Sequence, residues 1–229
     1  VSHHTAPQIL REKLFLEAPQ IEASLPLVVK KYMLTEAMVL STCNRFEIYF
    51  VCPSTEALWD AQPQLIRALH EAIGIDIGLD QELSQLSRYV YIYQDRKAVE
   101  HAFGVCSALD SLVLGETQIT NQFKAAWQLC KHIGVTGAIL HRLVSQSLSV
   151  SKMIRSQTEI GCGSVSVGSA AVDLVRLIFG RIEKHKVAII GAGEMARLAA
   201  QHIVKYQPRE LFIINRSAER AELLIKQLK

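Results

Sequence analysis

One of the five cysteines of this 229-residue chain has surroundings that suggest chemistry rather than packing. Cys43 lies in the stretch VLSTCNRFEIYF, at the break between two apolar runs that are typical of β-strands, and Arg45 follows two residues later. A thiol is mostly protonated at neutral pH, whereas a nearby cation favours the thiolate that acts as a nucleophile. Asn44 tolerates the backbone conformation of a turn. We therefore predict that Cys43 is a partly exposed nucleophile.

The cysteines as a set predict neither a disulfide framework nor a zinc site, because their number is odd and no CxxC occurs. Cys106 and Cys130 fall within helical apolar patterns, which favours positions in the core. Reduced thiols are typical of the cytoplasm. The sequence thus predicts a cytoplasmic protein without a metal site.

A second chemical motif follows the short buried run Val187–Ile190. The next six residues have the pattern GxGxxA and open a helical pattern, as a dinucleotide site requires; they are Gly191, Ala192, Gly193, Glu194, Met195 and Ala196. Gly191 permits the tight turn, Gly193 lets backbone N–H groups approach a pyrophosphate, and Ala196 keeps the helix close to the strand. The alternative is a close-packed βα turn without a ligand.

The following strand pattern, LFIINRS, ends where an NAD site would carry an acidic residue for the ribose hydroxyls. Asn215, Arg216 and Ser217 stand there instead. A carboxylate would repel a 2′-phosphate, whereas an arginine can pair with it. The sequence therefore predicts NADPH as the cofactor, the alternative being an exposed arginine at the start of a helix.

Together, a nucleophilic cysteine and a reduced nicotinamide suggest one class of reaction. The thiolate attacks an activated acyl group, a thioester forms, and a hydride reduces it to an aldehyde. These residue patterns alone indicate the class of reaction and not the particular substrate.

The composition is that of a globular protein, with 49% hydrophobic and 21% charged residues. The net charge of +3 permits a polyanionic partner but does not require one, because the basic residues are scattered. No run of 18 apolar residues lacks a charge, and no cationic segment followed by an apolar block opens the chain. We therefore expect neither a transmembrane helix nor a signal peptide.

Hydrophobic periodicity predicts a mixture of strands and helices before residue 95 and mainly helices from there to residue 158. The expected early elements are a helix after Pro7, a helix behind Pro26, strands on both sides of Cys43, an amphipathic helix over Pro63–Ile73 and a strand over Arg88–Gln94. The expected later elements are a helix with Asp95 as its N-cap, an apolar stripe of Ile119, Phe123, Trp127 and Cys130, and a long helix over Gly137–Gln157 with Leu140, Val144, Ser147 and Ile154 near one face.

The small-residue stretch Gly161–Gly168 permits two interpretations, a phosphate-binding loop and a hinge or helix entry. The second is favoured, because no Lys-Ser/Thr pair follows as in a phosphate loop. A helix to Phe179 and the strand–helix–strand–helix of the dinucleotide motif complete the chain.

The predicted fold class is α/β, with an N-terminal α/β catalytic domain, a long connecting helix and a partial Rossmann NADP-binding domain. We place the catalytic domain at residues 1–140, the connecting helix and hinge at 141–162, and the truncated Rossmann domain at 163–229. A complete doubly wound domain needs more strands than the βαβα pattern supplies. We therefore expect that the chain is a fragment, lacking a few residues before Val1 as well.

Four stretches in this order and spacing resemble the glutamyl-tRNA reductase family: SHHTAP, LSTCNRFEIY, LDSLVLGETQI, and GAGEMA with NRS. The resemblance covers essentially the whole chain, and STCNR with LDSLVLGE is highly specific. It implies NADPH-dependent reduction of glutamyl-tRNA to glutamate-1-semialdehyde, the committed step of the five-carbon route to 5-aminolevulinate and tetrapyrroles. It also implies glutamate-1-semialdehyde aminomutase as a partner, and a homodimer formed through a C-terminal domain that this chain lacks.

The resemblance assigns roles to individual residues. Cys43 matches the nucleophile, and His101 matches a histidine important for activity, although its pattern alone would favour a packed core histidine. The residues that match substrate contacts are Thr42, Asn44, Arg45, Ser111, Glu116, Thr117, Gln118 and Gln122. Arg45 would bind the side-chain carboxylate of glutamate and Glu116 its α-ammonium group, while Thr117 stands where proline is common in the family.

Two rival functions remain. A thiol-dependent aldehyde dehydrogenase of free metabolites would need no tRNA, but its nucleotide-binding domain usually comes first. A non-catalytic tRNA-binding module would have no need to keep the intact STCNR.

Overall fold

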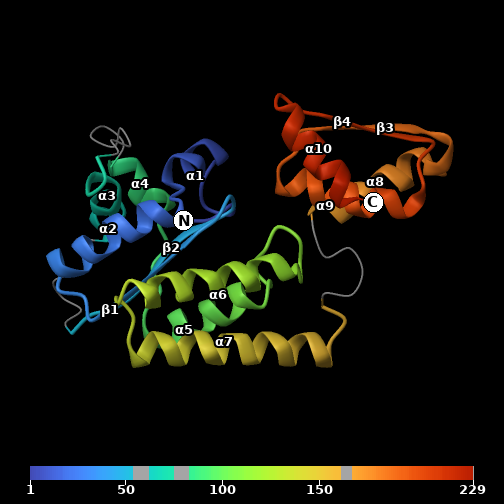
Figure 1. Ribbon diagram of the computed structural model, residues 1–229. Helices are drawn as coiled ribbons and strands as arrows, with labels where there is room; N and C mark the ends of the chain where they lie inside the picture. Colours follow the sequence, from blue (N-terminus) through green and yellow to red (C-terminus); the bar gives the residue numbers. More distant parts are fainter. Residues whose placement is uncertain (54–61, 75–82, 161–166, 229) are drawn as a thin grey trace. The chain divides into compact units, whose positions relative to one another are not determined.

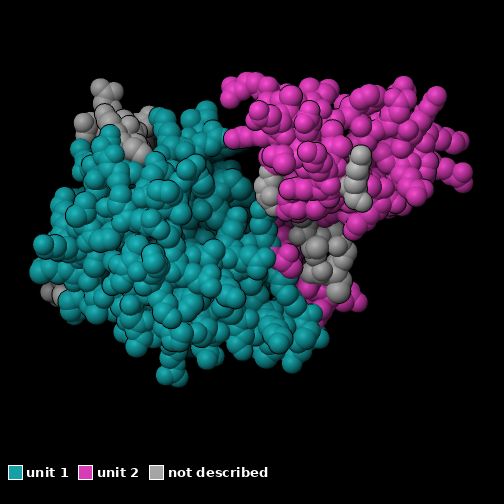
Figure 2. All heavy atoms as spheres, viewed as in Figure 1, with its two compact units in different colours: residues 1–112, 118–157 teal, residues 113–117, 158–229 magenta. Residues whose placement is uncertain are grey.

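A computed structural model describes residues 1–53, 62–74, 83–160 and 167–228. The chain forms two compact units, coloured separately in Figure 2. Unit 1 consists of Val1–Leu112 and Gln118–Gln157, and unit 2 consists of Val113–Thr117 and Thr158–Lys229. Each unit has its own hydrophobic core.

Unit 1 combines one two-stranded antiparallel sheet with seven helices among its described residues (Figure 1). The strands are β1 (Glu36–Ser41) and β2 (Phe46–Val51). The helices are α1 (Gln8–Leu14), α2 (Ala18–Lys31), α3 (Gln62–Glu71), α4 (Leu83–Tyr89), α5 (Asp95–Cys106), α6 (Thr117–His132) and α7 (Ala138–Gln157).

The two predicted strands around Cys43 are confirmed. Ser41 pairs with Phe46, so the four residues between them form the turn that carries the thiol. β1 contributes Ala37, Met38, Val39 and Leu40 to the core, all at most 1% exposed. A strand buried on both faces anchors the turn firmly, because every side chain along it is packed.

α7 is tied to the sheet by a buried carboxylate. The two oxygens of Glu36, from β1, accept hydrogen bonds from the backbone N–H groups of Ile139 at 3.0 Å and Leu140 at 2.7 Å. These donors lie in the first turn of α7, where N–H groups have no partner within the helix. The buried face of α7 contains Leu140, Val144, Ser147 and Ser151. Three of the four residues predicted for this face are therefore confirmed, and the fourth, Ile154, is half-buried.

The predicted strand over Arg88–Gln94 is wrong. α4 continues to Tyr89, and the backbone N–H of Val90 still bonds the Leu86 carbonyl in a helical pattern. Residues 91–94 then run without regular structure into α5. Alternating aromatic and β-branched residues favour a strand only where a partner strand is available, and Tyr91 instead turns its hydroxyl toward Glu47.

Two predicted helix starts also need correction. α2 begins at Ala18, so Pro26 lies inside the helix rather than before it. A capping box between Glu17 and Gln20 starts this helix, and burial of its apolar face outweighs the missing hydrogen bond at the proline. At α5, Gln94 rather than Asp95 occupies the N-cap position, and Asp95 is the first helical residue.

Unit 2 contains a parallel βαβ unit, as predicted. Its elements are α8 (Val167–Phe179), β3 (Lys186–Ile190), α9 (Glu194–Ile203), β4 (Glu210–Ile214) and α10 (Ala218–Gln227), with 3₁₀ turns at Ile182–Lys184 and Val204–Tyr206. β3 and β4 pair in parallel from Lys186↔Glu210 to Ile190↔Ile214. The predicted fold class is confirmed, while all of the predicted small-residue loop except its last two residues lies outside the described residues.

Close packing of α8 on α9 depends on Gly168. A Cβ at this position would lie 2.7 Å from the backbone nitrogen of Ala199. Among the described residues, no helix combines the length and the apolar composition that a membrane crossing needs.

Candidate active site

The turn that carries Cys43 is held by the preceding threonine. The Thr42 hydroxyl oxygen accepts hydrogen bonds from the backbone N–H groups of Asn44 at 3.3 Å and Arg45 at 3.1 Å. The Thr42 backbone N–H in turn donates to the Arg45 carbonyl at 2.9 Å. Thr42 is buried, whereas the Cys43 side chain is exposed. The turn therefore presents the thiol to solvent on a rigid support, as the sequence predicted.

The N-terminal segment braces the same turn from outside. The His3 backbone N–H donates to the Asn44 carbonyl at 2.8 Å. The Arg11 guanidinium donates from Nε to the Cys43 carbonyl at 3.3 Å and from Nη1 to the Ala6 carbonyl at 2.6 Å. The sequence pattern indicates no such role for Arg11, because a charged residue at this position of α1 is typical of a solvated helix face.

Arg45 points into the protein rather than into solvent, since its residue surface is only 2% exposed. Its Nη1 atom lies 2.6 Å from Oε1 of Glu47, and its Nη2 atom lies 3.1 Å from Oδ2 of Asp110. Nη2 also donates to the Asp110 backbone carbonyl. Both terminal nitrogens are thus engaged inside the chain, so this geometry gives Arg45 a role in joining the turn to the loop at Asp110.

Glu47 is the centre of the buried polar cluster. Its carboxylate accepts hydrogen bonds from Arg45, from Nε2 of His101 at 3.0 Å, and from the hydroxyls of Tyr49 and Tyr91. Burial alone would raise the pKa of Glu47, but the hydrogen bond from His101 and the charge of Arg45 outweigh it and hold the pKa well below its usual range. Glu47 therefore stays ionised at neutral pH.

The charge of Glu47 acts on the two tyrosines around it. Burial and the nearby carboxylate raise the pKa values of Tyr49 and Tyr91 far above the usual value of a tyrosine hydroxyl. Both hydroxyls therefore remain protonated donors. Neither the two tyrosines nor Glu47 was predicted from the sequence as part of the site. The available signal was a glutamate between Phe46 and Ile48 in an otherwise apolar strand, since a buried carboxylate is rare without partners.

His101 belongs to this cluster and is not a packed core histidine. Its side chain is 16% exposed and lies against the rings of Tyr91 and Tyr93, with centroids at 5.3 and 4.8 Å. Because an ionised carboxylate only accepts hydrogen bonds, Nε2 of His101 is the donor in this contact. Glu47 thereby fixes the orientation of the His101 ring.

The predicted substrate contacts lie on several parts of the chain. Arg45 binds Asp110, so Ser111, the next residue, lies on the loop that is joined to the turn. Glu116 and Thr117 group with unit 2, whereas Gln118 and Gln122 lie on α6. The predicted roles of these four residues stay predictions.

The other described thiols are poorly suited to nucleophilic chemistry. Burial raises the pKa of Cys106 and Cys130 to about 11, so both are protonated at neutral pH. Cys52 is half-buried near the far end of β2, and Cys162 lies outside the described residues. Within the described ranges, no three His, Cys, Asp or Glu side chains are grouped so as to hold a metal ion.

The glycine motif of unit 2 has the geometry of a dinucleotide-binding turn. Gly191 follows β3 with φ +110°, a conformation that side chains rarely adopt, and its N–H bonds the Ile214 carbonyl at 2.7 Å. Gly193 is the N-cap of α9, and a Cβ there would meet nothing within 4 Å. The space beside this helix N-terminus is therefore open to an anion. Glu194 begins α9, Met195 is exposed and Ala196 is half-buried.

The predicted cofactor-selecting residues lie at the same edge, since parallel strands end together. Ser217 caps α10 and its hydroxyl accepts from the Arg220 N–H at 3.4 Å, while the Asn215 amide donates to the Ser217 carbonyl at 2.9 Å. Arg216 between them is exposed. A cation next to an open glycine turn fits a phosphorylated ribose.

Unit 1 thus presents an exposed thiol on a braced turn, and unit 2 contains a Rossmann-type half-domain. Residues 1–158 match the family model described as glutamyl-tRNAGlu reductase, N-terminal domain. The chain therefore belongs to the glutamyl-tRNA reductase family. Residues 173–229 match the family model described as shikimate / quinate 5-dehydrogenase.

Individual relatives agree with this family. Glutamyl-tRNA reductase of Thiobacillus denitrificans is 37% identical over 227 residues, covering 99% of this chain and 51% of the relative. That of Aromatoleum aromaticum is 38% identical over 224 residues, covering 98% and 50%. The solved structure of glutamyl-tRNA reductase from Methanopyrus kandleri has a TM-score of 0.63 at 28% identity, covering 100% of this chain and 51% of that one. The chain thus spans about half the length of these relatives.

Proposed function

We propose that the protein reduces glutamyl-tRNA(Glu) to glutamate-1-semialdehyde with NADPH, the first committed step of tetrapyrrole biosynthesis by the five-carbon route. The observation that carries this proposal is the exposed Cys43 on a turn that Arg45, Glu47 and His101 hold together. Family membership supplies the substrate, because relatives over the whole chain are named for glutamyl-tRNA.

The two groups that would perform the acyl transfer, Cys43 and His101, lie in unit 1. Sγ of Cys43, as thiolate, attacks the glutamyl carbonyl carbon; a C–S bond forms, and the ester bond to the tRNA ribose oxygen breaks. The leaving oxygen takes up a proton, and His101 is the candidate donor and acceptor, since Glu47 holds its ring in place. Thr42, Asn44 and Ser111 would bind the glutamyl group, with Glu116, Thr117, Gln118 and Gln122 as further contacts.

The cofactor proposal rests on the open turn at Gly191–Gly193 and the exposed Arg216. The backbone N–H groups of this turn would bind the pyrophosphate and Arg216 the 2′-phosphate. Bound NADPH supplies the hydride that displaces the thiolate and releases the aldehyde. This proposal keeps the predicted division into a catalytic domain (1–140), a connecting helix and hinge (141–162) and an NADP-binding domain (163–229).

The same proposal includes the partners and the compartment. Glutamate-1-semialdehyde aminomutase would receive the labile aldehyde, and the intact protein would be a homodimer. A cytoplasmic location suits a nucleophilic thiol that must stay reduced.

The test is to expose the protein to glutamyl-tRNA without NADPH and to map any glutamyl adduct by peptide mass spectrometry. We expect the adduct on Cys43 and none in Cys43→Ser, because a hydroxyl is a far weaker nucleophile at neutral pH. Cys52→Ser is the matched control and should keep the adduct. An adduct that persists in Cys43→Ser, or maps to another cysteine, would refute the assignment of the nucleophile.

A further inference from the structure

The helical hairpin α6–α7 has an unusual charge composition. From Thr117 to Gln157 the sequence contains no Asp or Glu, whereas it contains Lys124, Lys131, Arg142, Lys152 and Arg155. The whole chain is nearly balanced, with 25 Lys and Arg against 22 Asp and Glu. Solvated helix faces usually mix both signs, because oppositely charged residues one turn apart stabilise each other. In this hairpin, all Asp, Glu, Lys and Arg positions are occupied by the positively charged types.

Several of these cations lie on the faces of α6 and α7 that contact each other through side chains. On α6 this face contains Thr120, Lys124, Trp127 and Lys131, and on α7 it contains His141, Ser145, Leu148, Lys152 and Arg155. The spacings of three and four residues place each set on one helix face. We call these nine residues the α6–α7 seam.

Contacts at both ends show that the two faces meet. The ring of Trp127 lies against that of His141, with centroids 5.2 Å apart, and Nη2 of Arg155 donates to the Thr120 hydroxyl at 3.0 Å. The first contact joins the end of α6 to the start of α7, and the second joins the opposite ends. Lys124 and Lys152 are both exposed, and they lie between these two contacts on the same seam.

Trp127 gives the seam an aromatic surface between its cations. The Lys131 ammonium lies 5.1 Å from the centroid of the half-buried Trp127 ring, and His141 covers the ring as well. The indole N–H has no acceptor among the described residues. A shift of a neighbouring side chain would let a phosphate or ribose oxygen accept this hydrogen bond.

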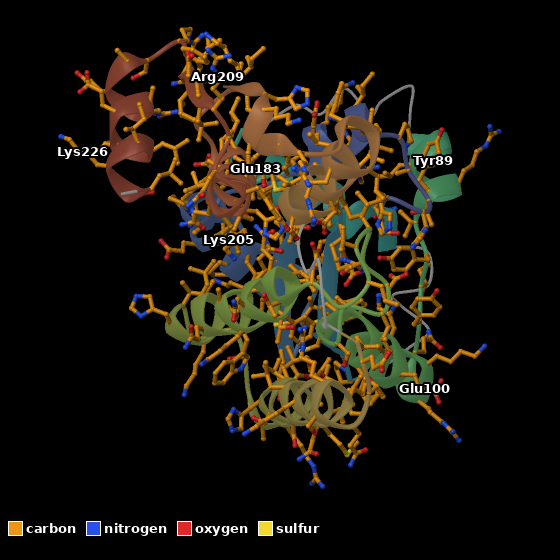
Figure 3. All side chains as sticks on the ribbon, turned by 90° about the vertical axis from the view of Figure 1, so that its right-hand side faces the viewer. Tyr89, Glu100, Glu183, Lys205, Arg209 and Lys226 are labelled. Carbon is orange, nitrogen blue, oxygen red and sulfur yellow. The ribbon has the colours of Figure 1, made fainter. Side chains whose placement is uncertain are left out.

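Two carboxylates that neighbour the hairpin, Glu36 and Glu100, have partners outside the seam. Glu36 is buried at the start of α7 and bound to two backbone N–H groups, and Glu116 is 8% exposed. Glu100, on the packed helix α5, pairs with Arg96 at 2.8 Å and lies at the outer edge of that helix in Figure 3. A row of cations with an aromatic ring is typical of surfaces that bind a nucleic-acid backbone.

We propose that the α6–α7 seam binds the sugar–phosphate backbone of tRNA. The inference rests on the proposed function, which makes a tRNA the carrier of the substrate. α7 packs directly on β1 and β2, the strands that hold the Cys43 turn, so seam and thiol belong to one unit. Backbone contacts there would position the acylated end without reading the sequence.

The test compares two triple variants with equal loss of charge, using uncharged tRNA(Glu). The seam variant is Lys124→Gln, Lys131→Gln and Lys152→Gln, and the control is Lys30→Gln, Lys31→Gln and Lys97→Gln, three exposed lysines elsewhere in unit 1. Filter binding at several salt concentrations gives the dissociation constant and its salt dependence. We expect the seam variant to bind at least tenfold more weakly, with a log–log salt slope reduced by about 2, as for three lost phosphate contacts. The control should stay within about twofold of the wild type.

The proposal is overturned if both variants bind tRNA equally weakly, or if the seam variant binds tRNA as tightly as the wild type. Circular dichroism verifies that all three proteins are folded. Seam-dependent binding to anionic vesicles with unaltered tRNA binding would overturn it in favour of a membrane surface. Transfer of glutamate to Cys43 separates this inference from the proposed function. If the wild type transfers glutamate normally and the seam substitutions do not weaken tRNA binding, only the proposed tRNA-binding role of the seam is refuted. If tRNA binding depends on the seam but the wild type transfers no glutamate to Cys43, only the proposed enzyme activity is refuted.

Discussion

At the scale of single residues, the buried cluster explains why the thiol turn needs an arginine two residues after the cysteine. Arg45 binds Glu47 with one terminal nitrogen and Asp110 with the other. A lysine presents one ammonium group on a flexible stem and cannot hold both acceptors in a fixed geometry. Arg45 therefore joins the Cys43 turn to the loop at Asp110.

We predict that Arg45→Lys lowers the rate of glutamyl transfer to Cys43 more than tenfold, because displacement by about 1 Å costs on the order of 100-fold. Rapid quenching with labelled glutamyl-tRNA measures the rate. Alkylation of Cys43 by iodoacetamide, which needs no substrate alignment, should change far less. Near-normal transfer would show that a point charge at this position suffices.

The low pKa of Glu47 makes stability depend on pH. A carboxylate with a folded-state pKa below its unfolded value stabilises the fold fully above the unfolded pKa, near 4.5, and this contribution is lost as pH falls toward the folded value. At pH 7 we predict that Glu47→Gln costs about 3–5 kcal/mol, as for a buried ion pair that loses one partner.

The matched control for Glu47 is Glu22→Gln, which changes an exposed residue of α2. Urea unfolding at several pH values measures both variants. Wild type and Glu22→Gln should lose stability more steeply below about pH 4.5 than Glu47→Gln does. Parallel curves for all three proteins would contradict the assigned role of Glu47.

Cys43 and its turn could be predicted from sequence, because a turn between two strands is a local pattern. The partners of Arg45 could not. Glu47 is close in sequence, but Asp110 lies 65 residues away and reaches the turn only through the packing of the loop after α5. Arg11 was missed for the same reason, since its contact with Cys43 joins residues 32 apart.

At the scale of secondary structure, predictions were correct where the local pattern and the tertiary packing agree, and wrong where packing overrides the local pattern. The helices α3, α6 and α7 have a repeated apolar face, and burial of that face decides their conformation. The Arg88–Gln94 stretch has the composition of a strand, but tertiary contacts of Tyr91 decided its conformation. In α2, packing of Ile21, Leu25 and Val28 outweighed Pro26.

Two glycines test how tightly helices pack. At Gly168 of α8, a methyl group would lie 2.7 Å from the backbone of α9, which cannot move as a side chain can. We predict that Gly168→Ala destabilises unit 2 by about 1–3 kcal/mol, as overpacking does. Gly104, inside α5, is the matched control, because a Cβ there meets nothing within 4 Å.

Gly104→Ala should stabilise unit 1 by about 0.5–1 kcal/mol, since alanine is the better helix former. Thermal unfolding monitored by circular dichroism gives both values. Two substitutions of the same type should therefore change the free energy of unfolding in opposite directions. A loss of stability at Gly104, or none at Gly168, would contradict the helix packing described for that unit.

At the scale of the whole molecule, the two halves of the proposed reaction belong to different units. The thiol turn and its cluster lie in unit 1, whereas the glycine turn and Arg216 lie in unit 2. The strand–glycine–helix order made the second unit predictable from sequence. Residues 113–117, which group with unit 2 although they follow α5, could not be assigned in this way, because chain order does not reveal which body a loop joins.

This separation predicts that Arg216→Ala impairs one half of the reaction only. Loss of a charge-assisted hydrogen bond to a 2′-phosphate should lower the preference for NADPH over NADH by about 1–3 kcal/mol, roughly 5- to 150-fold. Glutamyl transfer to Cys43 should be unchanged, because Cys43 and His101, the groups proposed to perform it, lie in unit 1. Titration of both cofactors with the intact protein and quantification of the adduct measure the two effects.

Cys43→Ser is the complementary control, which should bind NADPH normally and form no adduct. An unchanged cofactor ratio would show that Arg216 does not contact the 2′-phosphate, and slower transfer in Arg216→Ala would show that the two units act together before reduction.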